Sequence, residues 1–133
     1  TATTVDFTSA STSLYREAVS DLYQPTVTVT QGRALWAGNV LINSTAKNTI
    51  AHQGTNNEVN SIYQLIMQST ANQIMQSPFF KLKTYNLGDV NMNGETVFQG
   101  AGNDTEFIYL NVLKNHIGNG VGLNTFVIQE QIP

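Results

Sequence analysis

An internal repeat constrains this chain more than any other feature of its sequence. The segment QGTNNE at residues 53–58 aligns with QGAGND at residues 99–104, and the register continues without a gap. The positions that then coincide are Ile62 with Ile108, Tyr63 with Tyr109, Phe80 with Phe126 and Leu82 with Ile128. We therefore interpret the chain as an internal duplication, with a first unit at residues 37–86 and a second unit at residues 87–133.

A tight polar turn in the second unit has the spacing of a calcium loop. The sequence DVNMNG places the oxygen-bearing side chains of Asp89, Asn91 and Asn93 on alternate residues and then closes with Gly94. Calcium takes six to eight oxygen ligands, and loop positions 1, 3 and 5 supply them where a glycine at position 6 allows a sharp bend. We predict that these three side chains bind Ca²⁺ together with the backbone carbonyl of Glu95.

The acid that should complete such a loop comes late in this chain. An EF-hand loop has a bidentate acid at position 12, where this sequence has Gly100, and the acid follows four residues later as Asp104. We expect a widened loop from which Asp104 reaches back to the ion as it begins a helix, where its charge also suits the helix dipole. The alternative is an Asx-rich turn without metal, in which Asn103 or Asp104 is an ordinary N-cap.

The first unit keeps fewer of these oxygen ligands. Asn39, Leu41 and Asn43 stand where the second unit has its three ligands, and Glu58 is the remaining carboxylate. Because loop charge sets calcium affinity, we expect Asn39, Asn43 and Glu58 to form a weaker or empty site. Lys47 could place its ammonium group in the cation position against Glu58, or it could be a solvated loop lysine.

These motifs resemble the dockerin family. Its members carry tandem calcium loop-helix units with the pattern found at residues 88–94, and their helices dock onto a cohesin partner. Residues 34–133, with AGNV at 37–40 and FVIQEQIP at 126–133, look more like the C-terminal dockerin-like repeats of large Bacteroidetes surface proteins. The resemblance implies calcium ligands at Asp89, Asn91, Asn93, Glu95 (through its carbonyl) and Asp104. The dockerin residues that recognise cohesin do not map onto this chain.

The composition indicates an extracellular protein with a polar, weakly charged surface. Of the 133 residues, 41% are hydrophobic and only 11% are charged, and the net charge is -3, so copies repel one another little. Cysteine is absent, and a calcium-stabilised domain outside the cell needs no disulfide. The few basic residues are scattered and argue against nucleic acid, and no segment of the sequence suggests membrane insertion.

Residue patterns predict a single α+β domain, in which N-terminal strands pack with two duplicated calcium-loop and helix units. Strict alternation of β-branched residues predicts strands, and apolar residues near helical spacing predict helices. The predicted strands are residues 1–8 and 26–36, the helices 11–23, 58–77 and 104–115, and the short extended segments 79–85 and 125–131.

The sequence shows little that supports catalysis. The two histidines, His52 and His116, have no nucleophile motif or second ligand at metal spacing beside them. We expect His52, which aligns with Phe98, to be a half-buried aromatic filler, and His116 to be a favourable cation near the end of a helix. The sequence therefore predicts a protein that is not an enzyme.

Two non-catalytic functions fit the sequence. The first is a structural, calcium-stabilised subunit of a surface assembly or filament, in which the alternating residues 1–8 add to the sheet edge of another copy; the same residues could instead pair within their own domain. The alternative is a module that anchors a larger adhesin or enzyme to a protein or polysaccharide. Exposed aromatic side chains would serve a sugar platform, with candidates at Tyr15, Tyr23, Trp36 and Tyr63.

Overall fold

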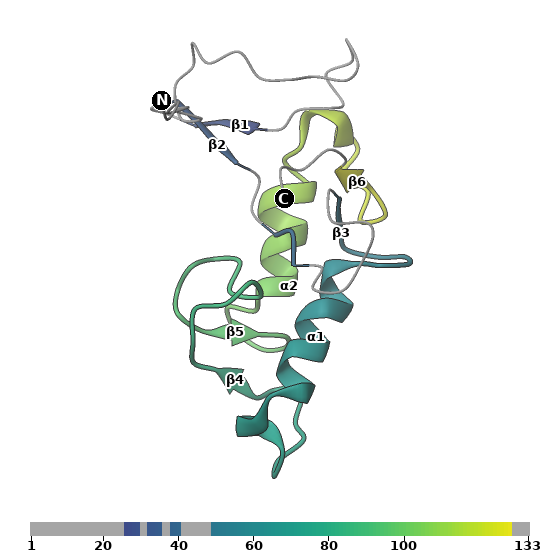
Figure 1. Ribbon diagram of the computed structural model, residues 1–133. Coiled ribbons are helices and arrows are strands. Elements are labelled where there is room, and N and C mark those ends of the chain that lie inside the picture. Colours follow the sequence, from purple (N-terminus) through teal and green to yellow (C-terminus); the bar gives the residue numbers. More distant parts are fainter. Residues whose placement is uncertain (1–25, 30–31, 36–37, 41–48, 129–133) are drawn as a thin grey trace, which may run out of the picture.

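The architecture mixes helices with small antiparallel sheets, as the predicted α+β class requires (Figure 1). A computed structural model describes residues 26–29, 32–35, 38–40 and 49–128. The strand expected at residues 1–8 and the helix expected at residues 11–23 lie outside the described residues.

The described elements follow the same order in the two units. In the first unit, they are β3 (Ile50–Ala51), α1 (Glu58–Gln68), a 3-10 turn (Thr70–Asn72) and β4 (Lys81–Leu82). In the second unit, they are β5 (Thr96–Val97), α2 (Asp104–Phe107) with a π-helical continuation (Ile108–Leu113), a 3-10 turn (Ile117–Asn119) and β6 (Val127–Ile128). Each unit therefore runs from an entry strand through a helix and a tight turn to an exit strand.

The two helices begin with the same cap. Asn57 precedes α1, and its side chain accepts a hydrogen bond from the Asn60 N–H at 2.9 Å. Asn103 precedes α2 in the same way and accepts from the Glu106 N–H at 2.7 Å. Asparagine is a favoured N-cap because its oxygen satisfies a backbone N–H that has no partner inside the helix.

Helix α1 ends at Gln68, so the predicted helix over residues 58–77 is too long. Ser69 adopts an extended backbone and caps the following 3-10 turn with its own side chain, which accepts from Ala71. The buried Asn72 side chain then donates to the carbonyls of Ile66 and Ser77 and accepts from the Ser77 N–H. These bonds reverse the chain at the point where apolar spacing alone suggested that the helix continued.

The second helix extends to Leu113, close to the predicted end at residue 115, but its last part widens into a π-helix. Lys114 donates to the carbonyl of Tyr109, which lies five residues earlier. Such a turn holds one more residue than an α-helical turn. The following turn is one residue shorter in the second unit and restores the alignment of the two units. Asn119 accepts from the N–H of Leu123, four residues later, whereas Asn72 accepts from the N–H of Ser77, five residues later.

The strand expected over residues 26–36 is instead an antiparallel hairpin. Strands β1 (Thr26–Val29) and β2 (Gly32–Leu35) pair with Thr26 opposite Leu35 and Val29 opposite Gly32. The run of β-branched residues ends at Thr30, and Gly32 follows, a residue that weakens a strand interior. Pairing the two halves gives their backbone groups partners that one isolated strand would lack.

The extended segment expected after the first helix is shorter than predicted, and the one expected after the second helix begins two residues later than predicted. In the first unit, only β4 is a strand, since Thr84 donates back to the carbonyl of Leu82 and turns the chain. In the second unit, β6 occupies Val127–Ile128, and residues 129–131 lie outside the described residues.

The two units exchange strands reciprocally (Figure 1). Entry strand β3 of the first unit pairs with exit strand β6 of the second, and entry strand β5 of the second pairs with exit strand β4 of the first. Aromatic contacts follow the same exchange: the rings of His52 and Tyr109 lie 5.4 Å apart, and those of Phe98 and Tyr63 lie 5.1 Å apart. Each unit thus completes the sheet and the aromatic pair of the other.

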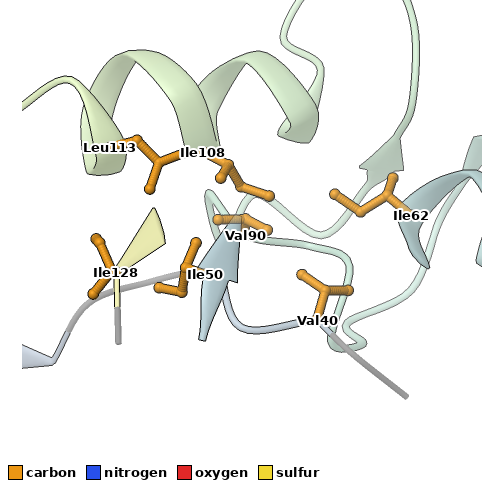
Figure 2. Packing of buried hydrophobic residues seen from close by; sticks show 7 residues of the cluster. All are labelled: Val40, Ile50, Ile62, Val90, Ile108, Leu113 and Ile128. Carbon is orange, nitrogen blue, oxygen red and sulfur yellow. The ribbon is translucent and has the colours of Figure 1, made fainter. Parts of the chain in front are cut away.

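The core lies between the units and draws on both of them (Figure 2). Its fully or almost fully buried members are Val40, Ile50, Ile62, Val90, Ile108, Leu113 and Ile128. Aligned positions are buried together, as Ile62 and Ile108 show, with no exposed surface on either. Because this cluster forms only when both units are present, neither unit has a complete core of its own.

Reciprocal exchange predicts that the two halves stay together after the chain is cut between them. A protease site inserted between Thr84 and Tyr85 would lie among exposed residues. After cleavage, we expect the fragments to co-elute in size-exclusion chromatography and to separate only in denaturant, because each fragment supplies one strand to each of these two sheets. The uncut insertion variant is the control. Separate elution of the fragments in native buffer would contradict this interlocked arrangement.

Candidate metal centre

The loop after Gly88 is a chain of hydrogen bonds from backbone N–H groups to side-chain oxygens. The two carboxylate oxygens of Asp89 accept from Asn93 at 3.0 Å and from Gly94 at 2.9 Å. The side-chain oxygen of Asn91 accepts from Asn93 at 3.0 Å, and that of Asn93 accepts from Glu95 at 2.8 Å. The predicted ligands Asp89, Asn91 and Asn93 therefore form one turn, as their alternate spacing requires.

Asp104 reaches back to this loop from the first position of α2, as predicted. Its side chain is buried, and one oxygen accepts from the N–H groups of Val90 at 2.9 Å and Asn91 at 3.3 Å. The other oxygen accepts from Val97 in β5 at 2.8 Å. One carboxylate thus joins the start of the loop, the entry strand and the start of the helix.

Two buried carboxyl groups face this loop, and their charges oppose each other. Burial raises the pKa of Asp104, three backbone hydrogen bonds act against that rise, and the nearby charge of Asp89 adds to it. Asp89 is itself only 3% exposed. In the described part of the chain, neither carboxylate has a lysine or arginine within ion-pair distance. A bound cation would remove this repulsion.

The oxygen atoms at the loop retain capacity for a hard cation. Each side-chain oxygen has two acceptor sites, and both oxygens of Asp89 use one of them, as do the amide oxygens of Asn91 and Asn93. Asp104 keeps one acceptor site, on the oxygen that Val97 contacts. The donor set is entirely oxygen, which suits Ca²⁺, so the residues present fit the predicted ion.

Glu95 uses its side chain elsewhere. Its carboxylate lies 3.3 Å from Lys81 Nζ and 4.0 Å from Lys83 Nζ on the β4–β5 sheet. Only its backbone carbonyl is available to the loop, which is the ligand that the sequence predicts. Sequence reasoning gave no role to these lysines, although their alternate positions in a predicted strand indicate a shared face.

In the first unit, Glu58 occupies the position of Asp104. One of its oxygens accepts from the Ala51 N–H, as Asp104 accepts from Val97. Glu58 has no exposed surface, and its other oxygen, Oε1, accepts no hydrogen bond in the described part of the chain. Burial raises the pKa of this carboxyl group to about 7 against the opposing backbone hydrogen bonds. Glu58 is therefore partly protonated at neutral pH, which weakens it as a calcium ligand.

The other candidates of the first unit are not brought to Glu58 by any described contact. Asn39 is half-buried and has a polar interaction of its own. Asn43 and Lys47 lie outside the described residues. The weaker site and the two alternatives for Lys47 remain predictions.

The prediction for His116 is wrong, whereas His52 is the half-buried aromatic filler that we expected. His116 is 2% exposed, burial lowers its pKa, and its Nδ1 accepts a hydrogen bond from the Gly118 N–H at 3.0 Å. A nitrogen that accepts a hydrogen bond carries no proton, so this imidazole caps the following 3-10 turn instead of serving as a surface cation. Ser69 has the same capping role in the first unit.

Within residues 38–40 and 49–128, no three His, Cys, Asp or Glu side chains come together to hold a metal, so the candidate centre depends on amide and carbonyl oxygens beside its two carboxylates. No helix in the described ranges is long and apolar enough to cross a membrane. Comparison of the chain with protein-family models, curated proteins and solved structures found no match.

Proposed function

We propose that this protein is a non-catalytic, calcium-binding structural module of the cell surface or extracellular space. The observation that carries the proposal is the approach of two buried carboxylates, Asp89 and Asp104, at one oxygen-lined loop. Burying two like charges without a cation is costly. Calcium binding there would fix the angle between the loop, β5 and α2, because Asp104 holds all three.

The duplication of calcium-loop and helix units belongs to this proposal. It is supported by hydrogen bonds that recur at aligned positions. The Asn57 and Asn103 side chains each donate to a glycine carbonyl three residues earlier, and Glu58 and Asp104 each accept from the entry strand before them. Asn72 and Asn119, which align once the extra π-helical residue is allowed for, each hold the turn after a helix through hydrogen bonds to the backbone before and after that turn. We infer that the second unit binds the ion and that the first retains the framework with a weaker or empty site.

Self-assembly by strand addition is the form of structural role that we propose. The described sheets have two strands each, so each strand has one edge outside its pair. Such an edge can accept a further strand through backbone hydrogen bonds. The donor that we propose, residues 1–8, has the alternating β-branched sequence this pairing needs. A dockerin-like anchor or polysaccharide-binding module is the alternative, and it predicts a monomer in calcium.

Calcium titration tests the metal proposal directly. We expect isothermal titration calorimetry to detect one strong site, and we expect chelation to lower the melting temperature. Asp89→Ala should remove most of the binding, since it deletes one of two ligating carboxylates. Glu106→Gln is the matched control, because it neutralises an exposed acid two residues from Asp104 and leaves the loop intact. Calcium binding by Asp89→Ala with wild-type affinity would contradict the proposed centre.

A further inference from the structure

Two lysines and a tyrosine lie in strand β4 and in the residues just after it. Lys81 and Lys83 both reach the Glu95 carboxylate, so their ammonium groups lie close to one acid. The Tyr85 ring lies against Gly94, the residue before Glu95: a Cβ atom added to Gly94 would be 3.5 Å from the ring atom Cζ. We refer to Lys81, Lys83 and Tyr85 as the lysine–tyrosine patch.

The patch is exposed and carries a positive charge. The side chains of Lys81 and Lys83 are 50% and 78% exposed, and Tyr85 is 72% exposed. The two ammonium groups share the single carboxylate of Glu95, so one positive charge stays uncompensated in a chain of net charge -3. The exposed Tyr85 ring offers an apolar face, and the lysine ammonium groups offer N–H donors.

The patch belongs to one unit. The positions in the second unit that align with Lys81, Lys83 and Tyr85 are Val127, Gln129 and Gln131. The basic and aromatic side chains are therefore present in the first unit and absent from the aligned positions of the second. This implies one such binding site per chain.

We propose that the lysine–tyrosine patch binds an acidic polysaccharide in which uronic acid sugars alternate with neutral ones. The ring of Tyr85 would stack on the apolar face of a sugar, and the lysine ammonium groups would bind its carboxylate and hydroxyl groups. A polymer with one carboxylate per two sugars is repelled less by the net charge of -3 than nucleic acid, which carries a charge on every nucleotide.

This inference goes beyond the calcium proposal and does not depend on it, because none of the three side chains is a proposed ligand of the ion. Binding by the wild-type protein in calcium and in chelator alike would support the patch even if the metal proposal failed. Conversely, a bound calcium ion without any affinity for the glycan would leave the metal proposal standing and overturn the patch.

A titration with a hyaluronan octasaccharide tests the proposal. We expect one site per chain, an affinity that falls as NaCl rises from about 0.05 M to about 0.5 M, and no binding of a neutral maltooligosaccharide. The double variant Lys81→Gln/Lys83→Gln and the single variant Tyr85→Ala should each weaken binding about five- to tenfold or more, whereas Tyr85→Phe should retain it, since the ring is kept. The control Lys114→Gln removes one positive charge from an exposed lysine outside the patch and should bind as the wild type does.

Several outcomes would overturn the proposal. Wild-type affinity in the double lysine variant or in Tyr85→Ala would do so, as would an equal loss in Lys114→Gln, which would indicate a general charge effect. Tighter binding of a single-stranded DNA oligonucleotide than of hyaluronan would assign the patch to nucleic acid instead. Because the substituted side chains are exposed, far-UV circular dichroism should show that each variant keeps its fold.

Discussion

Replacing Asp104 with alanine is expected to lower the free energy of unfolding by about 3 to 5 kcal/mol, because a buried N–H group left without a partner costs about 1–3 kcal/mol. Three backbone N–H groups, of Val90, Asn91 and Val97, would lose their acceptor together. The expected loss is therefore large even without metal. Urea denaturation in the presence of a chelator measures it, and the same experiment in calcium shows how much the ion adds.

Asp104→Asn separates the hydrogen-bonding role from the charge. The amide keeps one acceptor oxygen at the same place, so we expect an intermediate loss of stability in chelator. In calcium, however, the asparagine variant should gain less than the wild type, since it lacks the ligand charge. An alanine variant within about 1 kcal/mol of the wild type would show that the three N–H groups find other partners and that Asp104 does not hold the loop.

Glu58 should make stability fall as the pH rises. Its pKa is about 7 in the folded protein and about 4.5 in the unfolded chain. A group whose pKa is raised by folding contributes stability that is complete below the unfolded value and is lost as the pH passes the folded value. Between about pH 5 and about pH 8.5, this loss amounts to about 2 to 3 kcal/mol.

Comparing the wild type with Glu58→Gln isolates this effect. Burial lowers the pKa values of His52 and His116, so their contribution has the opposite sign and is lost as the pH falls below about 6.5. Both histidines are present in the two proteins and cancel in the comparison. We therefore measure the free energy of unfolding of both proteins in chelator across this pH range. As the pH rises, the wild type should lose stability relative to Glu58→Gln. A difference that stays constant with pH would refute the assignment, and Glu106→Gln, which removes an exposed acid, should follow the wild type.

The sequence alone predicted the elements that depend on local signals. The predicted starts of both helices, at Glu58 and Asp104, were confirmed. The spacing of Asp89, Asn91 and Asn93 predicted a single polar turn, because Asx side chains bond backbone groups two residues on. The return of Asp104 to that turn was also predicted, although its described partners are backbone N–H groups.

The ends of the elements were harder to predict because they depend on contacts made after the chain has folded back. The predicted helix over residues 58–77 is too long. The chain turns after Gln68, and the Asn72 side chain holds that turn by donating to the carbonyls of Ile66 and Ser77. The prediction that His116 is a cation is wrong for a related reason: the imidazole is buried, with its ring centroid 5.2 Å from that of Phe126, and this burial lowers its pKa. A π-helical residue in the second unit is likewise invisible to an alignment that runs without a gap.

The polar loop and the starts of the two helices were determined by the order of residues, because each rests on contacts between neighbours in the chain. Which strand pairs with which was decided only in three dimensions. Two similar units offer each entry strand two similar exit strands as partners, and local sequence cannot distinguish the exit strand of its own unit from that of the other. Packing of both units around one shared core selects the exchanged pairing, and the same packing buries Glu58 and His116, which raises the pKa of the first and lowers the pKa of the second.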